Sequence, residues 1–352
     1  MTTTPTTVSA LIPADHDEFA AFLAASPSAR FSHELAWATA LLDTYGLRSE
    51  HLIARRAGRI VGALPLFLSR SVVLGRHLTS CPFPSHARPV HADDEALDAL
   101  LGAVAERTPA VGYTHVVCAE PLPATPLLAR FVARSDDLTF RLPLATDKDA
   151  LLSGLSKNIR RDARAAERQG VMVSADRDGA RTDEFYRLYS AMTAKKHGMP
   201  PHSRALFENL WRCLGPSGMR VHFAHQRGRC LAVVMTLRAR GEIYYAWSAS
   251  DPAESALNAT TLVLQRIIEE GCEEGMRVFD MGESPKEHEG LVRFKRRWCP
   301  VELETHGYFL LGRATSLPVH FYGGFGWQKR VIARLPVALT TRLISPLLRF
   351  VV

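Results

Sequence analysis

The order of apolar and polar residues predicts a chain of alternating helices and strands. In the first half, apolar residues at helical spacing predict helix within Asp15–Leu42, and apolar runs around Ala57-Gly58-Arg59 predict a hairpin of His51–Arg55 and Ile60–Leu68. The same patterns predict helices over Asp94–Glu106 and Leu127–Ala133, and strands over Tyr113–Ala119 and Asp137–Leu144. Residues 1–10 carry no such pattern and predict a disordered lead.

A second set of elements follows a boundary near Asp147. A polar helix is predicted from Asp147 to Gln169, with Gly170 in the C-cap position. Beyond it the pattern predicts a strand at Val171–Ala175, helices at Thr182–Lys196 and Ser203–Leu214, antiparallel strands at Arg220–Gln226, Cys230–Arg238 and Glu242–Ser248, a helix at Asn258–Glu274, and strands at Arg277–Met281 and Glu302–Leu311.

The two halves share a repeated hairpin. Leu52–Ala63 and Phe223–Val233 align with one constant offset when Gly58 is placed on Gly228, and each copy is an apolar strand, a Gly-Arg turn and a second apolar strand. We therefore predict an α+β (mixed α/β) fold of two tandem domains, residues 1–146 and 147–312, with mostly antiparallel central sheets and flanking helices. A pair of unrelated α+β domains is the alternative.

Composition indicates the number of domains and the cellular compartment, but it does not identify the function. The 352 residues exceed the usual size of one compact core, and the formal net charge of +7 suits an anionic partner or simply solubility. Six scattered cysteines favour a reducing compartment, and the first residues lack the basic and apolar regions of a signal peptide. A cytoplasmic location is expected, and we expect no DNA partner.

Two motifs in the second half resemble the FemAB/FemX-like proteins, a GNAT-type acyltransferase group. They are Arg277–Ser284, which contains Phe279-Asp280-Met281-Gly282, and Gly290–Trp298, which contains Phe294-Lys295. The segment from Val61–Leu66 through Ser80–Pro84 is similar to the N-terminal half of the same group. The resemblance covers roughly residues 15–312. It implies two GNAT-like domains, in which strands splay apart to open a cleft for the acyl donor, and transfer of an activated acyl group to an amine.

The resemblance also implies site residues. In Fem-type members the lysine of the Phe-Lys motif helps to bind the donor and to stabilise the reacting carbonyl, so Lys295 is expected to be catalytic, backed by Phe294 and Trp298. A positioned ammonium stabilises the negative oxygen that forms during aminolysis. Asp280, at the end of an apolar strand, is expected to accept a proton from the amine or to orient it. Glu283 is a substrate-binding candidate that departs from the group's usual residue.

Two further groups of residues are candidates for substrate binding. Lys157, Arg161, Arg164 and Arg168 recur on one face of a helix whose opposite face carries Ile159, Ala163 and Ala166, so they are suited to bind phosphates. Solvated helix faces often look the same. Tyr245 and Trp247 share one face of a strand by its period of two, and that face either belongs to the core or lines an acceptor groove.

The donor and acceptor are left open by the sequence. The resemblance implies aminoacyl-tRNA as donor and an amine of a cell-envelope or polysaccharide precursor as acceptor. An acyl-CoA donor is the alternative, weakened because Ser255–Thr261 contains no glycine where a phosphate-binding loop would lie. No tightly bound cofactor and no metal site are predicted. A non-catalytic RNA- or lipid-binding relative is the third possibility.

The tail, residues 313–352, is basic and amphipathic. It has six cations and no acidic residue; its apolar residues include Phe321, Phe325, Trp327, Val331, Leu335, Leu339, Leu343, Leu347 and Leu348. Such a segment either contacts an anionic membrane surface, on the inner face if the protein is cytoplasmic, or docks as a helix on the catalytic domain.

Overall fold

The computed structural model describes residues 4–72, 74–83, 86–317 and 326–350, which form two compact units. Unit 1 comprises the described residues up to Leu138 with 303–317 and 349–350, and unit 2 comprises 139–302 with 326–348. The expected boundaries at 146/147 and 312/313 therefore differ from the observed ones. The strand β9 (Val132–Pro143) starts earlier than predicted and contributes to both units, as does β15 (Val301–Leu311). Phe321 and Phe325 lie outside the described residues.

Unit 1 contains two sheets and three α-helices among its described residues. The first sheet has the order β1-β3-β4-β7, and the strands β15, β8, β6, β5 and β2 pair in that order in the second. The remaining elements are β1 (Thr7–Ala10), α1 (His16–Ala25), α2 (Leu35–Tyr45), β2 (Arg48–Ser49), β3 (Leu52–Arg56), β4 (Arg59–Leu64), β5 (Phe67–Ser71), β6 (Gly75–Thr79), β7 (Val90–His91), α3 (Asp94–Arg107) and β8 (Tyr113–Cys118).

Three local predictions for unit 1 are corrected. Thr7–Ala10 is not disordered but pairs with β3, because the open edge of that strand offers backbone partners. The predicted strand Ile60–Leu68 is two strands, since Pro65 supplies no N–H to a ladder and separates them. The helix predicted near Leu127 is only a 3-10 turn at Leu128–Arg130.

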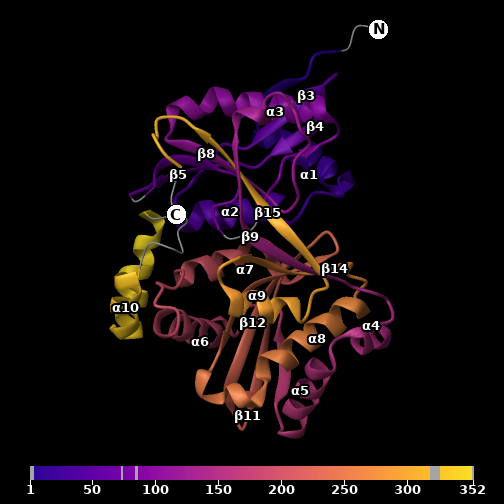
Figure 1. Ribbon diagram of the computed structural model, residues 1–352, viewed down its shortest axis with the longest axis vertical. Helices are drawn as coiled ribbons and strands as arrows, with labels where there is room; N and C mark the ends of the chain where they lie inside the picture. The colour runs from indigo at the N-terminus through magenta and orange to yellow at the C-terminus, as the bar shows by residue number, and fades with distance from the viewer. Residues whose placement is uncertain (1–3, 73, 84–85, 318–325, 351–352) are drawn as a thin grey trace. The chain divides into compact units, whose positions relative to one another are not determined.

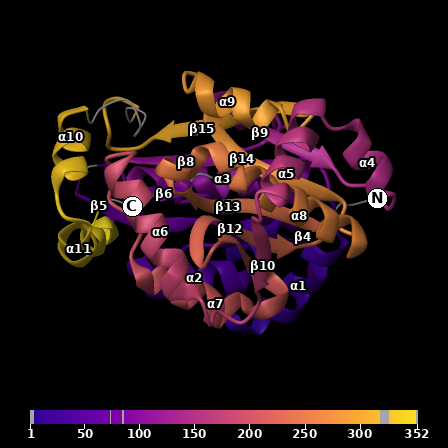
Figure 2. The same ribbon diagram turned by 90° about the horizontal axis from the view of Figure 1, so that it is seen from below.

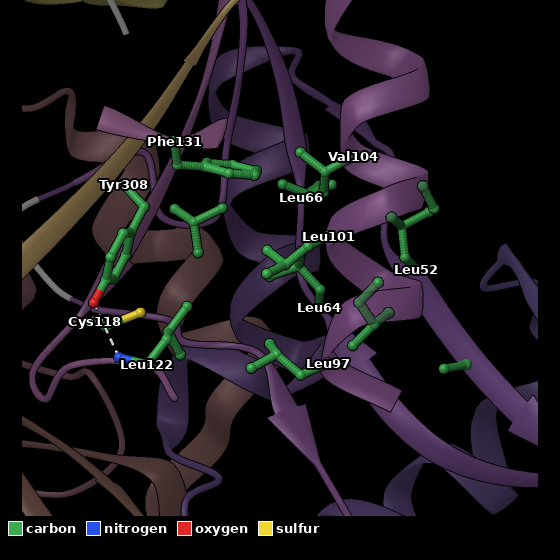
Figure 3. Packing of buried hydrophobic residues seen from close by; sticks show 14 residues of the cluster. Leu52, Leu64, Leu66, Leu97, Leu101, Val104, Cys118, Leu122, Phe131 and Tyr308 are labelled. Carbon is green, nitrogen blue, oxygen red and sulfur yellow. Dashed lines mark hydrogen bonds between the residues drawn. The ribbon is translucent and has the colours of Figure 1, made fainter. Parts of the chain in front are cut away.

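The core of unit 1 lies between α3 and its strands. Leucines from β3, β4 and α3 interdigitate with Cys118 and Phe131, and the Tyr308 hydroxyl accepts a hydrogen bond of 3.0 Å from the Leu122 N–H (Figure 3). Helix α3 begins at Asp93, whose carboxylate accepts from the Ala96 N–H and so satisfies one of the free donors of the first turn.

Unit 2 is one mixed sheet with helices on both faces. Its strands pair in the order β10-β11-β12-β13-β14, antiparallel except for the last pair, β13 with β14. The sheet lies between α6 and α7 on one side and α8 and α5 on the other (Figures 1 and 2). The elements are α4 (Lys148–Gly154), α5 (Lys157–Arg168), β10 (Met172–Asp176), α6 (Thr182–Lys195), α7 (Arg204–Gly218), β11 (Met219–Gln226), β12 (Arg229–Ala239), β13 (Glu242–Ser250), α8 (Ala259–Glu273), β14 (Val278–Pro285) and α9 (Glu289–Arg296).

The polar helix predicted over 147–169 is two helices. Leu155 is extended, and Ser156 then begins α5 by accepting a hydrogen bond from the Ile159 N–H. A serine side chain that caps a new helix competes with continuation of the old one.

The hairpin repeat is observed in detail. The turn residues Ala57 and Gly58 have φ angles of 49° and 79°, and Arg227 and Gly228 have 49° and 76°, as a two-residue turn with two positive φ angles requires. Each hairpin also has a bulge at the equivalent place, after Ala54 in the first and after Ala224 in the second. Two unrelated hairpins would not be expected to share a bulge position, so the structure supports a duplication.

The helical part of the tail packs on α6. It consists of α10 (Gly326–Arg334) and a second helix that starts with α11 (Val337–Leu339) and continues as a π-turn and a 3-10 turn to Phe350. Lys195 Nζ of α6 donates to the carbonyls of Ala333 and Leu335 at 3.2 and 2.6 Å. No helix among the described residues is long and apolar enough to cross a membrane.

Candidate active site

The strands β13 and β14 separate after a short stretch of pairing. They pair in parallel over three positions, from Glu242 with Val278 to Tyr244 with Asp280, although each strand continues for several residues. Both then bend: Ala246 is an extra residue opposite β12, and Gly282 in β14 has a φ of +67°. A bulge bends a strand away from its neighbour. The splayed strands that the resemblance implied are therefore present in unit 2.

Lys295 lies at the point where β14 bends. It belongs to α9, is only 4% exposed, and its Nζ donates hydrogen bonds to the carbonyl oxygens of Gly282 at 3.1 Å and Glu283 at 2.8 Å. A buried ammonium is stable only when its donors have such acceptors. The side chain does not extend into solvent, and its charge is fixed beside the separating strands.

Asp280 is part of the same polar cluster. Its carboxylate accepts hydrogen bonds from Arg141 Nε at 2.9 Å, Thr139 Oγ1 at 3.3 Å and the Gly282 N–H at 2.7 Å, and the residue is 2% exposed. Gly282 thus connects the two predicted catalytic residues, since its N–H binds Asp280 and its carbonyl binds Lys295. The ion pair with Arg141 favours an orienting role for Asp280 over proton transfer.

Arg141 and Gly282 were missed by sequence reasoning. Arg141 comes from β9, far from Asp280 along the chain, so no local pattern connects them. Gly282 had a visible signal, because a glycine inside an apolar strand often marks a bulge or a close approach. Cys299 lies near the same cluster, where burial and then the Asp280 charge raise the pKa of its thiol.

Gly282→Ala is expected to destabilise unit 2 by about 2 to 3 kcal/mol, the sum of a left-handed backbone for alanine and a steric clash. A Cβ at this position would lie 2.7 Å from the Tyr244 hydroxyl oxygen. Chemical denaturation measures the change.

Gly275→Ala is the matched control, because Gly275 also has a positive φ of 70° but no atom within 4 Å of an added Cβ. It should cost about 1 kcal/mol for the backbone alone. The double variant Gly282→Ala/Tyr244→Phe should recover part of the loss. Equal losses for the two glycine variants would contradict a close contact with Tyr244.

The aromatic residues predicted to bind substrate do not share one face. The bulge at Ala246 reverses the alternation of β13, so Trp247 packs on Phe207 of α7, while Tyr245 contacts Phe279 and donates to Ser248. The predicted common face of Tyr245 and Trp247 is therefore wrong, because a one-residue bulge shifts a period of two. The two rings remain beside the region where the strands separate.

The other residues around Lys295 differ in exposure. Trp298 is 2% exposed, so its indole is part of the core, and its backbone N–H donates to the Lys295 carbonyl at the end of α9. Phe294 and Glu283 are half-buried, and the Glu283 backbone carbonyl is one of the two acceptors of the Lys295 ammonium. Phe294 and Glu283 therefore keep some exposed surface, whereas Trp298 has almost none.

The cationic residues of α5 line a shallow pocket of about 370 Å³. Its lining is entirely basic: Lys157, Arg160, Arg161, Arg164 and Arg168. The opposite face of the helix is buried through Ile159, Ala163 and Ala166, as expected. Arg160 was missed, although it lies three residues after Lys157 and four before Arg164 and so shares their face.

The acidic residues of α5 do not neutralise this pocket completely. Asp162 pairs with Arg161 and Arg297, and Glu167 pairs with Arg266 of α8. Among the described residues, no carboxylate lies within ion-pair distance of Lys157, Arg160, Arg164 or Arg168. The pocket is therefore a concentrated positive site suited to phosphate groups.

The tertiary structure brings together three potential metal ligands that the sequence separates. Glu184 of α6, His225 of β11 and Cys230 of β12 have ligand atoms within 4.8 Å of one another. Arg181 already bonds to both Glu184, at 2.7 Å, and His225, at 3.0 Å. Unit 1 has a related contact, in which Glu18 of α1 binds Arg55 at the equivalent bulge. We interpret both as anchors of the bulged hairpins.

Comparison with known proteins agrees with this geometry. Residues 153–296 match the family described as "Acetyltransferase (GNAT) domain". The structure is similar to that of FemX, with a TM-score of 0.65 at 15% identity over 87% of this chain and 97% of that one. It is also similar to the C-terminal domain of a putative lysylphosphatidylglycerol synthetase from Agrobacterium fabrum. The TM-score is 0.55 at 13% identity, over 85% of this chain and 92% of that one.

A third similar structure is a tandem GNAT protein from the clavulanic acid biosynthesis pathway, with a TM-score of 0.52 at 12% identity over 89% of this chain and 99% of that one. No curated protein matches the sequence significantly. At these identities the structural similarity establishes the fold, and the expected tandem GNAT arrangement is confirmed. The chain has the fold of the tandem GNAT proteins, and its residues 153–296 match the GNAT acetyltransferase domain family.

Proposed function

We propose that the protein is an acyltransferase that moves an acyl or aminoacyl group from an activated donor to an amine. The observation that carries the proposal is the buried ammonium of Lys295, held by two carbonyls where β14 separates from β13. The match of residues 153–296 to a GNAT acetyltransferase domain supports the same reaction class.

The reaction consists of one addition and one elimination. The nitrogen lone pair of the amine attacks the donor carbonyl carbon, a C–N bond forms, and the carbonyl oxygen becomes negative. Lys295 stabilises that oxygen, and a preorganised charge in a dry site does so more effectively than water. The C–O or C–S bond to the donor then breaks, and the leaving oxygen or sulfur takes the electron pair and the proton that the amine loses.

The basic pocket on α5 supports a donor that carries phosphates. Aminoacyl-tRNA and acyl-CoA both meet this requirement. We favour an aminoacyl donor, because the similar structures include FemX and a domain of a putative lysylphosphatidylglycerol synthetase, whose product name contains a lysyl group. The acceptor in this proposal is an amine of a cell-envelope or polysaccharide precursor. The proposal includes a cytoplasmic location. It is supported by the six cysteines, all within the described residues, which form no disulfide.

An acetyl-CoA-dependent N-acetyltransferase is the second candidate. Asn258, the residue before α8, has a left-handed backbone with φ 52° and ψ 29°, and its side chain makes no hydrogen bond that caps the helix. Asparagine is among the few residues that tolerate this conformation, which glycine usually adopts. The lack of glycine in 255–261 therefore counts less against a coenzyme A donor than the sequence indicated.

Arg161→Gln/Arg164→Gln is expected to weaken binding of aminoacyl-tRNA at least about tenfold and to reduce the slope of log affinity against log salt by about 1 to 2. The reason is the loss of two phosphate-binding cations. Filter binding across a salt series, with acetyl-CoA measured in parallel by calorimetry, tests it.

Arg187→Gln, which removes an exposed cation of α6 outside the pocket, is the control and should bind like the wild type. Tight acetyl-CoA binding without tRNA binding would favour the second candidate. If neither donor binds the wild-type protein, the proposed function is wrong.

A further inference from the structure

The last helix of the chain carries a row of exposed leucines. Leu339, Leu343 and Leu347 are 39%, 61% and 53% exposed and recur every four residues, whereas Thr340, Ser345 and Leu348 between and beside them are buried. Val331 of α10 adds a fourth exposed apolar side chain at 46%. Single exposed apolar residues are ordinary, but a regular row of leucines marks an interaction surface.

The opposite side of this helix is fixed to unit 2. Thr340 and Ser345 are almost completely buried, and the Thr340 N–H and hydroxyl both donate to the Pro336 carbonyl. Helix α10 also packs closely on unit 2, since a Cβ added to Gly198 would lie 2.4 Å from the Lys329 carbonyl oxygen. Helices α10 and α11 therefore pack on α6 (Figure 2), and the three leucines remain exposed to solvent. The sequence left open whether the tail docks on the catalytic domain or contacts a membrane surface, and a docked tail with exposed leucines is compatible with both.

The charged residues of the tail itself are all of one sign. Arg330, Arg334 and Arg342 are exposed, and no acidic residue occurs in the sequence after Glu304. Among the described residues, none of these three arginines has a carboxylate within ion-pair distance. An anionic lipid surface complements both features, because acyl chains accept the leucines and headgroup phosphates accept the guanidinium groups.

We propose that this face, defined by Val331, Leu339, Leu343, Leu347, Arg330, Arg334 and Arg342, attaches the protein to the surface of an anionic phospholipid bilayer. Because the helix is already folded and docked, binding requires no coil-to-helix ordering. Attachment does not depend on the transfer chemistry, so it can be tested separately from the proposed function.

Flotation of the full-length protein with vesicles tests the attachment. The wild type should float with vesicles of equal parts phosphatidylcholine and phosphatidylglycerol and remain behind with phosphatidylcholine alone. Leu339→Ser/Leu343→Ser/Leu347→Ser should lower the partition coefficient at least about a hundredfold. Arg330→Gln/Arg342→Gln should lower it about 25-fold, with a weaker dependence on salt.

Two control variants remove similar groups elsewhere. Met172→Ser replaces an apolar residue of β10 that is 69% exposed, and Arg59→Gln replaces an exposed cation of β4; both should float like the wild type. Circular dichroism confirms that each variant is folded. The proposal is overturned if the wild type does not float or if the triple variant floats equally well. It is also overturned if the wild type is a dimer that the triple variant dissociates and no vesicle binding occurs.

Discussion

Replacement of Lys295 by methionine is expected to lower the turnover of acyl transfer by about two to three orders of magnitude, the usual cost of losing one group that stabilises an oxyanion. Methionine has a similar length and no charge, so the packing of α9 is largely preserved. The carbonyls of Gly282 and Glu283 lose a donor, which costs about 1 to 3 kcal/mol and is offset because no ammonium has to be buried. The turnover number with the donor and amine that the wild type accepts is the measurement.

Arg293→Met is the matched control for this prediction. Arg293 is an exposed cation of the same helix, so its loss changes the local charge equally but leaves the buried ammonium in place. Its turnover should stay within about twofold of the wild type, as for a screened surface charge. A folded Lys295→Met protein with unchanged turnover would exclude Lys295 from catalysis. Turnover that is lost with the fold retained would exclude a purely non-catalytic binding protein.

Asp280→Asn is expected to destabilise the protein by about 3 to 5 kcal/mol, because it leaves the Arg141 guanidinium buried without its counter-ion. The pair is largely shielded from water, with side-chain exposures of 11% for Arg141 and 2% for Asp280. Urea unfolding measures the loss. Glu302→Gln, which removes a more exposed ion pair with Arg296, should cost less than about 1 kcal/mol.

A double variant separates the ion pair from the chemistry. Asp280→Asn/Arg141→Met removes both charges and should be less destabilised than the sum of the single variants, by about 1 to 3 kcal/mol. Arg141→Met keeps the Asp280 carboxylate. If Asp280 accepts the proton of the amine, Asp280→Asn loses far more turnover than Arg141→Met does. If Asp280 orients β14, the two variants lose similar amounts.

Features that depend on neighbouring residues along the chain were determined by the sequence. The turns at Ala57-Gly58 and Arg227-Gly228 follow from the need for positive φ angles, and the basic face of α5 follows from helical spacing. The motif that contains Lys295 follows the strand of Asp280 in the sequence, and the structure shows its ammonium bonded to that strand; the burial of the ammonium was not predicted. For the turns and for the helix face, the signal and its cause lie within a few residues of each other.

The tertiary structure alone decided the features that connect distant residues. Arg141 became the partner of Asp280 because β9 and β14 belong to one unit, and the bulge at Ala246 separated Tyr245 from Trp247. The start of β9 at Val132 moved the domain boundary, and the burial of Thr340 fixed which side of the tail faces outward. Spacing along the sequence records the local geometry of a helix or strand. It does not record which buried groups must satisfy one another across elements, because that choice is made when the whole core packs.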